Sequence, residues 1–323
     1  MPFLTAEQME HFEEEGYLLL RGMLDVDAVI QPIIDEYHGV LDNLARELYA
    51  TGQIESTYDE LPFGQRLTRI VIDSGQIHAQ YFDFSLPQTG IEPDTPFWAG
   101  PAVFNCLTHP DLLDAAESVV GPEIWSNPVQ HVRLKPPERL VPRDHNGQAL
   151  VSATSWHQDN GVVLSEADQS QVLTVWFPLN PATIENGCLQ VMPRSHRAGL
   201  HTHCPGGTSG LRIPEQFMDM DSALPLPMDP GDVLLLTQHT IHGSLVNESD
   251  DVRWSFDLRY NAIGQATGRD FFPGFVARSK ARSASVLRDP LVWEQLWRDT
   301  RDRLARKEQA VFNRWSADAA VCA

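Results

Sequence analysis

Two histidines and one aspartate in this chain could together bind a metal ion. His157 and Asp159 lie two residues apart in Trp156–Asp159, and His242 comes much later, in Ile241–Ser244. In extended backbone, side chains two residues apart leave on the same face, so one strand could supply two ligands. Two imidazoles and a carboxylate suit a non-haem Fe(II) oxygenase, because they leave one face of the metal open. From residue types and spacing alone, the alternative is about as plausible as a metal site: His157 and Asp159 could be a chance pair, and His242 a histidine of the core.

An arginine on the strand predicted after His242 is the second feature that could do chemistry. Arg253 lies in Asp251–Phe256, where alternation places its side chain on the same face as Ser255. A buried guanidinium between apolar neighbours needs an anionic partner, and a bidentate carboxylate is the best geometric match. The alternative is a structural arginine paired with one of the many acids of this chain.

Composition limits the kinds of partner that the chain could have. The chain has 323 residues, 42% of them hydrophobic and 21% charged, with a formal net charge of −20 and a pI of about 4.9. An acidic surface argues against nucleic acid and against an anionic membrane. No apolar run is long enough to span a membrane, and the start lacks a basic n-region and an apolar h-region. The four cysteines form no Cys-x-x-Cys pair, so we expect reduced thiols in a cytoplasmic protein.

Helical signals dominate the first part of the chain. Thr5 and Gln8 form a capping box that opens a helix ending at Gly16, and a buried strand follows over residues 17–20. Apolar residues at helical spacing predict a second helix over residues 26–51 and another over residues 110–120. Residues 52–100 show little periodicity, and we expect mixed loops there.

Strand signals dominate from residue 123 onward. Alternating or apolar runs predict strands at 129–134, 172–177, 189–192, 233–236 and 254–260, with loops over 138–154 and 197–228. Many short strands separated by turns indicate a mainly β fold with flanking helices, built on a jelly roll (a double-stranded β-helix). We expect one domain: a helical part over 1–122, a jelly-roll core over 123–262 and a helical tail over 286–317.

Taken together, these segments resemble the phytanoyl-CoA dioxygenase family of Fe(II)/2-oxoglutarate-dependent oxygenases. The resemblance covers most of the chain and rests on several ordered motifs. These are the opening Leu4–Gly22, Trp156–Asp159, the block Glu185–His196, and Pro230 through Ser244 followed by Arg253. It implies a cupin-like double-stranded β-helix that uses Fe(II), 2-oxoglutarate and O₂.

The resemblance also implies roles for individual residues. His157, Asp159 and His242 would bind the iron, and Arg253 would pair with the distal carboxylate of 2-oxoglutarate. Trp176 and His131 stand where the family has further 2-oxoglutarate contacts, although ordinary core packing is an alternative for both.

The reaction implied is oxidation of a C–H bond of a small-molecule metabolite, with release of succinate and CO₂. Hydroxylation is favoured over halogenation, because halogenating relatives replace the carboxylate at position 159 with a small residue. No basic cluster suits the phosphates of CoA, so the family name does not transfer that substrate. A cupin-like metal-binding protein or isomerase without O₂ chemistry is the alternative, and a catalytically inactive relative is a third possibility.

Two other histidine-containing segments could be mistaken for metal ligands. His201, His203 and Cys204 could chelate Zn²⁺, but no fourth ligand is evident and a loop over the active site is the better interpretation. His239 stands an odd number of residues before His242, so on an extended strand it would face the opposite way.

Overall fold

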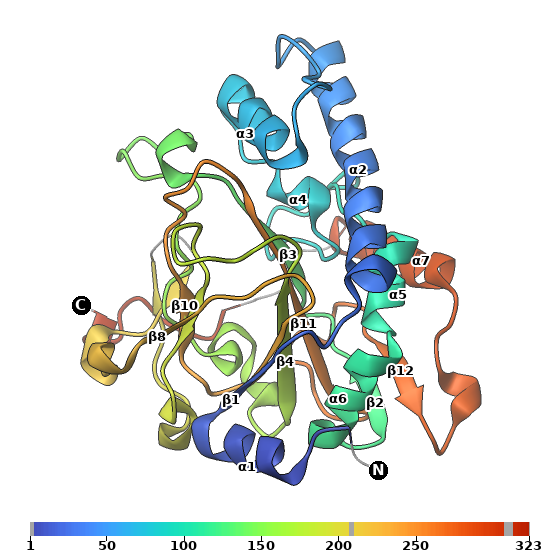
Figure 1. Cartoon of the computed structure of the whole chain (residues 1–323), viewed down its shortest axis with the longest axis vertical. Helices are drawn as coiled ribbons and strands as arrows, with labels where there is room; N and C mark the ends of the chain where they lie inside the picture. The colour runs from blue at the N-terminus through green and yellow to red at the C-terminus, as the bar shows by residue number, and fades with distance from the viewer. Residues whose placement is uncertain (1–2, 207–209, 307–312, 323) are drawn as a thin grey trace.

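The computed structural model describes residues 3–206, 210–306 and 313–322. Two antiparallel sheets face each other, and helices cover the outer side of the larger sheet (Figure 1). This arrangement is the predicted mainly β fold with flanking helices, in the jelly-roll class and without a closed barrel. Within these described ranges, no helix is both long and apolar enough to cross a membrane.

The helices follow the predicted order and include some that the sequence did not predict. They are α1 (Ala6–Glu15), α2 (Gln31–Ala50), α3 (Phe63–Ser74), α4 (Ala79–Phe82), α5 (Pro101–Leu107), α6 (Pro110–Val120) and α7 (Pro290–Leu304). The capping box of Thr5 and Gln8 is confirmed, and so is the left-handed Gly16 that ends α1. A π-helical turn, Val26–Ile30, precedes α2 and together with it fills the predicted 26–51 helix.

The prediction of loops over residues 52–100 was wrong for α3 and α4. The start of α3 carries poor signals, because Pro62 caps it without a side-chain hydrogen bond and Gly64 lies in its first turn. The charged Arg66 also lies on the buried face of α3, where it pairs with Asp42 and Asp59. A charged residue at a core position hid the apolar stripe of this helix.

The larger sheet has seven strands and carries most of the core. Six run in the order β1 (Tyr17–Leu20), β9 (Val233–Thr237), β4 (Val172–Pro178), β11 (Arg253–Ala262), β2 (Glu123–Ser126) and β12 (Phe275–Ser279), and β3 (His131–Lys135) also pairs with β11. The smaller sheet has the order β10 (His242–Ser244), β5 (Leu189–Val191) and β8 (Leu224–Leu226). The prediction of a loop over 197–228 was wrong for β8 and for a short pair of strands, β6 (Cys204–Pro205) and β7 (Leu211–Arg212).

Alternation along β11 separates the hydrophobic core from the inner face. Trp254, Phe256, Leu258 and Tyr260 are buried in the core shared with the helices. The residues that alternate with them project toward the smaller sheet, and they are Arg253, Ser255, Asp257, Arg259 and Asn261. On β3, Val132 and Leu134 join the same core, so His131, Arg133 and Lys135 share the inner face with the polar side of β11.

The C-terminal part departs from the predicted helical tail over 286–317. The helix α7 ends at Leu304, and the described residues 313–316 are not helical. Arg314 binds Asp168 (2.5 Å) and the Asn160 carbonyl (2.7 Å), and the Trp315 indole N–H donates to the Gly161 carbonyl (2.6 Å). These polar contacts, rather than an apolar helical stripe, hold the tail against the 159–162 segment.

A disulfide joins Cys204 to Cys322, and this contradicts the expectation of reduced thiols throughout. The two cysteines are 118 residues apart in sequence, so no local motif announced the pairing. Cys106 and Cys188 are free, as expected for reduced thiols, and both are buried.

Candidate metal centre and cosubstrate site

Three ligand-type side chains converge between the two sheets. One ligand atom from each of His157, Asp159 and His242 lies within 4.8 Å of the other two, and no other group of this kind occurs in the described ranges. His157 and His242 form an isolated antiparallel bridge, with both N–H···O distances at 3.0 Å. Gln158 is extended (φ −115°, ψ 140°), so His157 and Asp159 leave on the same side, as the spacing predicted.

Backbone carbonyls fix the orientation of both imidazole rings. The Nδ1 atom of His157 donates to the Ser155 carbonyl (2.8 Å), and that of His242 donates to the Thr240 carbonyl (2.9 Å). A carbonyl can only accept, so each ring carries its proton on Nδ1 and presents the Nε2 lone pair. Both Nε2 atoms lie 3.8 Å from Oδ1 of Asp159. Burial and the neighbouring His242 lower the pKa of His157 to about 3, which keeps this imidazole neutral.

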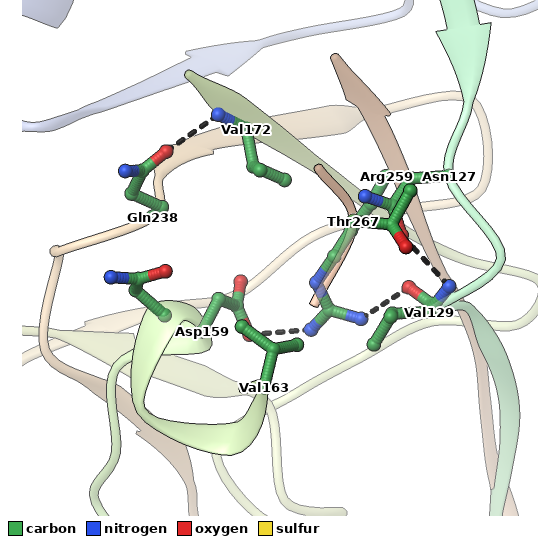
Figure 2. A pocket seen from close by; sticks show the side chains of 9 residues that line it. Asn127, Val129, Asp159, Val163, Val172, Gln238, Arg259 and Thr267 are labelled. Atoms are coloured by element: carbon green, nitrogen blue, oxygen red, sulfur yellow. Dashed lines mark hydrogen bonds and ion pairs between the residues drawn. The ribbon is translucent and has the colours of Figure 1, made fainter. Parts of the chain in front are cut away.

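The larger sheet holds the carboxylate of Asp159. Thr174 of β4 donates to Oδ2, and Arg259 of β11 forms an ion pair with Oδ1. Figure 2 shows the Arg259 guanidinium reaching between Asp159 and the Val129 carbonyl, to which it donates at 2.6 Å. Burial alone would raise the pKa of Asp159, but Arg259 and the two histidines outweigh it and hold that pKa below its usual range. Asp159 is therefore ionised and fixed in position.

The side chain of Gln158 points away from the centre and fastens the surrounding loops. Its Nε2 donates to the Gly199 and His239 carbonyls (2.7 Å each), and its Oε1 accepts from the His201 N–H (2.8 Å). Underneath, Nε2 of His203 accepts from the Gln158 backbone N–H (2.9 Å). Burial lowers the pKa of His203 to about 4, so this ring is a neutral acceptor.

The alternative ligand sets predicted to be decoys do not form a metal site. Cys204 is in the disulfide with Cys322, and His203 supports Gln158. His239 lies beside Asn160, with 3.4 Å between its Nε2 and the amide nitrogen, outside the group of three converging ligands. Both outcomes agree with the preference for His242.

Arg253 is buried without an acidic partner among the described residues. Its side chain is 1% exposed, it donates to the Ser255 hydroxyl (2.8 Å), and its Nε has no hydrogen-bond acceptor there. Its guanidinium carbon lies 5.6 Å from the centre of the Trp176 ring. Burial and the nearby Arg133 lower its pKa to about 10. The structural alternative, pairing with an acid of this chain, is therefore not what is found.

Trp176 and His131 lie in one row across the inner face of the larger sheet. Each is opposite Asp257 of β11, Trp176 from β4 and His131 from β3. Nδ1 of His131 lies 2.8 Å from an oxygen of Asp83 and 3.0 Å from the Ser85 hydroxyl, so Nε2 is the ring atom left for a cosubstrate. The structure brings both residues to the expected face without testing their roles.

Sequence reasoning missed two residues that hold Asp159. Arg259 shares the inner face of β11 with Arg253. The same alternation along the strand could have identified it as a second buried cation. Thr174 shares the inner face of β4 with Trp176 and carried no signal of its own, because an inward threonine is ordinary in a strand.

Comparisons with known proteins agree with this geometry. The family described as "Phytanoyl-CoA dioxygenase (PhyH)" matches residues 12–255. Phytanoyl-CoA dioxygenase domain-containing protein 1 of Mus musculus is 25% identical over 293 residues, covering 85% of this chain and 94% of that protein.

Solved structures show the same fold. The apo form of the non-heme monooxygenase ThoJ superimposes with a TM-score of 0.59 at 19% identity, covering 91% of this chain and 95% of its own. EvdO2 from Micromonospora carbonacea var. aurantiaca, complexed with 2-oxoglutarate, gives 0.51 at 21% identity, covering 80% of this chain and 91% of its own.

Proposed function

The chain belongs to the phytanoyl-CoA dioxygenase family, which depends on Fe(II) and 2-oxoglutarate, and we propose that it hydroxylates an unactivated C–H bond of a small-molecule metabolite. His157, Asp159 and His242 hold the iron in this proposal, and Arg253 holds the distal carboxylate of 2-oxoglutarate. When bound, iron supplies an oxidation in which 2-oxoglutarate and O₂ become succinate and CO₂, while one oxygen atom enters the substrate.

The donor set fits Fe(II). Two imidazoles present Nε2 and one ionised carboxylate presents Oδ1, which is the mixed nitrogen and oxygen set that this ion takes. Each ring donates a hydrogen bond to a backbone carbonyl and the carboxylate accepts one from Thr174, which sets their direction before a metal arrives. A carboxylate at position 159 leaves no room for a halide ligand, and this supports hydroxylation over halogenation.

The single observation that carries the proposal is that the buried Arg253 has no acidic partner among the described residues. A buried guanidinium without an acid is costly, because its desolvation is not repaid within the protein. A dicarboxylate whose other end chelates the metal would bring the missing charge and two acceptors. The Trp176 ring beside the guanidinium then limits how that carboxylate can turn, and His131 offers Nε2 on the same face.

Succinate release tests the proposal directly. Purified protein with Fe(II), labelled 2-oxoglutarate and O₂ is screened against candidate metabolites for succinate that depends on the added compound. We expect at least one metabolite to raise succinate above the uncoupled background, with a product heavier by one oxygen atom. His157→Ala is the matched inactive control.

Metal binding without any succinate would favour a cupin-like metal-binding protein or isomerase instead. Failure to bind a metal would favour an inactive relative. Either result would contradict the proposed hydroxylase.

A further inference from the structure

A cavity lined by two basic side chains lies next to the inner face of β3. It has a volume of about 510 Å³ and is lined by Arg133 and Lys135, by Gln80 and Gln88, and by residues 150–154. Lys135 connects this cavity to the proposed centre, because its Nζ contacts the hydroxyl of Ser244, two residues after His242, and Lys135 lies opposite Arg253 in the sheet. A small metabolite fits such a volume.

Arg133 faces this cavity without a partner. It is exposed, and among the described residues no hydrogen bond or ion pair engages its side chain. The strand register sets it opposite Ser255 on β11, two positions along from Arg253. Among the described residues, the Arg133 side chain thus has no acid to pair with, although the chain carries a formal net charge of −20.

Lys135 forms the fixed part of the same basic wall. It is buried opposite Arg253, and its Nζ donates to the Ser152 carbonyl (2.9 Å), the Thr154 hydroxyl (2.6 Å) and the Ser244 hydroxyl (2.9 Å). All three acceptors are neutral. Burial, together with repulsion from Arg253 and Arg133, holds the pKa of Lys135 well below its ordinary value. An anion bound here would relieve that repulsion.

In the proposed function, 2-oxoglutarate is held by the metal and Arg253 rather than by Arg133. Arg259 already pairs with Asp159 and Asp257. This leaves Arg133 and Lys135 against Asp83, which is the acid that lines the cavity and is already engaged by His131 (2.8 Å). With the cosubstrate bound, the side chain of Arg133 would therefore still have no acidic partner among the described residues.

We propose that this cavity is the substrate subsite and that Arg133 binds an oxyanion of the substrate, such as a carboxylate or a phosphate. This inference rests on the proposed function and names the chemical class of its substrate. Arg133 offers the planar pair of N–H donors that such a group accepts, and an anion bound there would favour the charged form of Lys135 behind it. Neutral metabolites of the same size would lack these contacts.

Fluorinated probes test the subsite without knowledge of the natural substrate. Protein with Fe(II) and saturating 2-oxoglutarate, kept anaerobic, is titrated with 4-fluorobenzoate, 4-fluorophenyl phosphate and the neutral 4-fluorobenzamide, and binding is followed by ¹⁹F NMR. We expect at least one anion to bind roughly tenfold or more tightly than the amide, and Arg133→Gln to abolish that difference. Arg139→Gln is the matched control, since Arg139 is exposed and paired with Asp250 outside the cavity.

Each outcome of this titration either supports or overturns the proposed substrate subsite. Comparable binding of amide and anions, or an equal loss in both variants, would overturn the subsite. A higher 2-oxoglutarate requirement in Arg133→Gln, with anion binding unchanged, would assign Arg133 to the cosubstrate instead. Cosubstrate binding is read separately, from the visible charge-transfer band of the wild type, so failure of the proposed function is distinguishable from failure of the subsite.

Discussion

At the scale of single residues, the site is built from side chains whose charges are balanced only when ligands are present. Asp159 is held by Arg259 and Thr174, so its carboxylate is oriented before any metal binds. Arg253 is buried with a neutral hydroxyl as its partner and an aromatic ring beside it. The first arrangement prepares a ligand, and the second leaves a charge for the cosubstrate to neutralise.

Replacing Arg253 separates the cosubstrate role from a structural one. Because this buried guanidinium lacks an acid, Arg253→Met should leave the thermal stability of the ligand-free protein unchanged or higher. The 2-oxoglutarate concentration needed for half-maximal succinate release should rise at least tenfold. Differential scanning fluorimetry with and without 2-oxoglutarate checks both parts. A large loss of stability in the ligand-free variant would restore the structural interpretation.

Arg259 should act through Asp159 rather than on the substrate. Arg259→Gln removes the ion pair that orients the carboxylate, and we expect metal affinity to fall about 10- to 100-fold. Arg259→Lys should recover part of the loss. Arg278→Gln is a matched control, because Arg278 pairs with Asp114 and Glu117 on α6. Competition with a metal-sensitive dye measures the affinity, and tighter or unchanged binding in Arg259→Gln would refute this role.

At the scale of elements, the centre depends on segments from opposite sheets meeting at one bridge. His157 pairs with the first residue of β10, while Asp159 opens a 3-10 turn that reaches back to β4 and β11. Sequence alternation predicted the shared direction of His157 and Asp159 and the inward face of Arg253. It could not predict which distant carbonyl fixes each ring, because such contacts depend on loops brought together by the fold.

The 199–206 segment supports the centre through His203, and this support should depend on pH. The folded-state pKa of about 4 is below the unfolded value near 6.5, so the unfolded chain binds the proton more readily. Stability from this group is full above about pH 6.5 and is lost as the pH falls toward 4. His203→Gln keeps an acceptor that does not titrate, so its urea-unfolding profile should be flatter over this range. Parallel profiles for both proteins would rule this contribution out.

At the scale of the whole molecule, the N-terminal and C-terminal parts of the chain contact different regions of the sheets. Helices that precede β2, α6 among them, cover the outer face of the larger sheet (Figure 1). The C-terminal tail instead contacts the 159–162 segment beside the metal centre, through Arg314 and Trp315. Strand spacing sufficed to predict the fold class and, within the larger sheet, the strands β1, β3, β4, β9 and β11. The sequence patterns missed α3, whose buried Arg66 interrupts the apolar stripe, and the disulfide, whose partners are 118 residues apart.

The Cys204–Cys322 bond should stabilise the native protein by restricting the unfolded chain. Cys322→Ser should lower the free energy of unfolding by about 2–5 kcal/mol, with a matching decrease in melting temperature. A reductant should produce the same decrease in the wild type and no further change in Cys322→Ser. Thiol titration of the denatured, unreduced protein should count only the two free cysteines, Cys106 and Cys188. Four titratable thiols would contradict the bond.

The most direct test of the proposed centre is an anaerobic titration of the protein with Fe(II) and 2-oxoglutarate, followed by visible absorbance. The account predicts a weak charge-transfer band that saturates at one equivalent of each. The band should be absent in His157→Ala, and in Arg253→Met it should require far more 2-oxoglutarate. No band in the wild type, or an unchanged band in His157→Ala, would contradict the assignment of His157, Asp159 and His242 as the iron ligands.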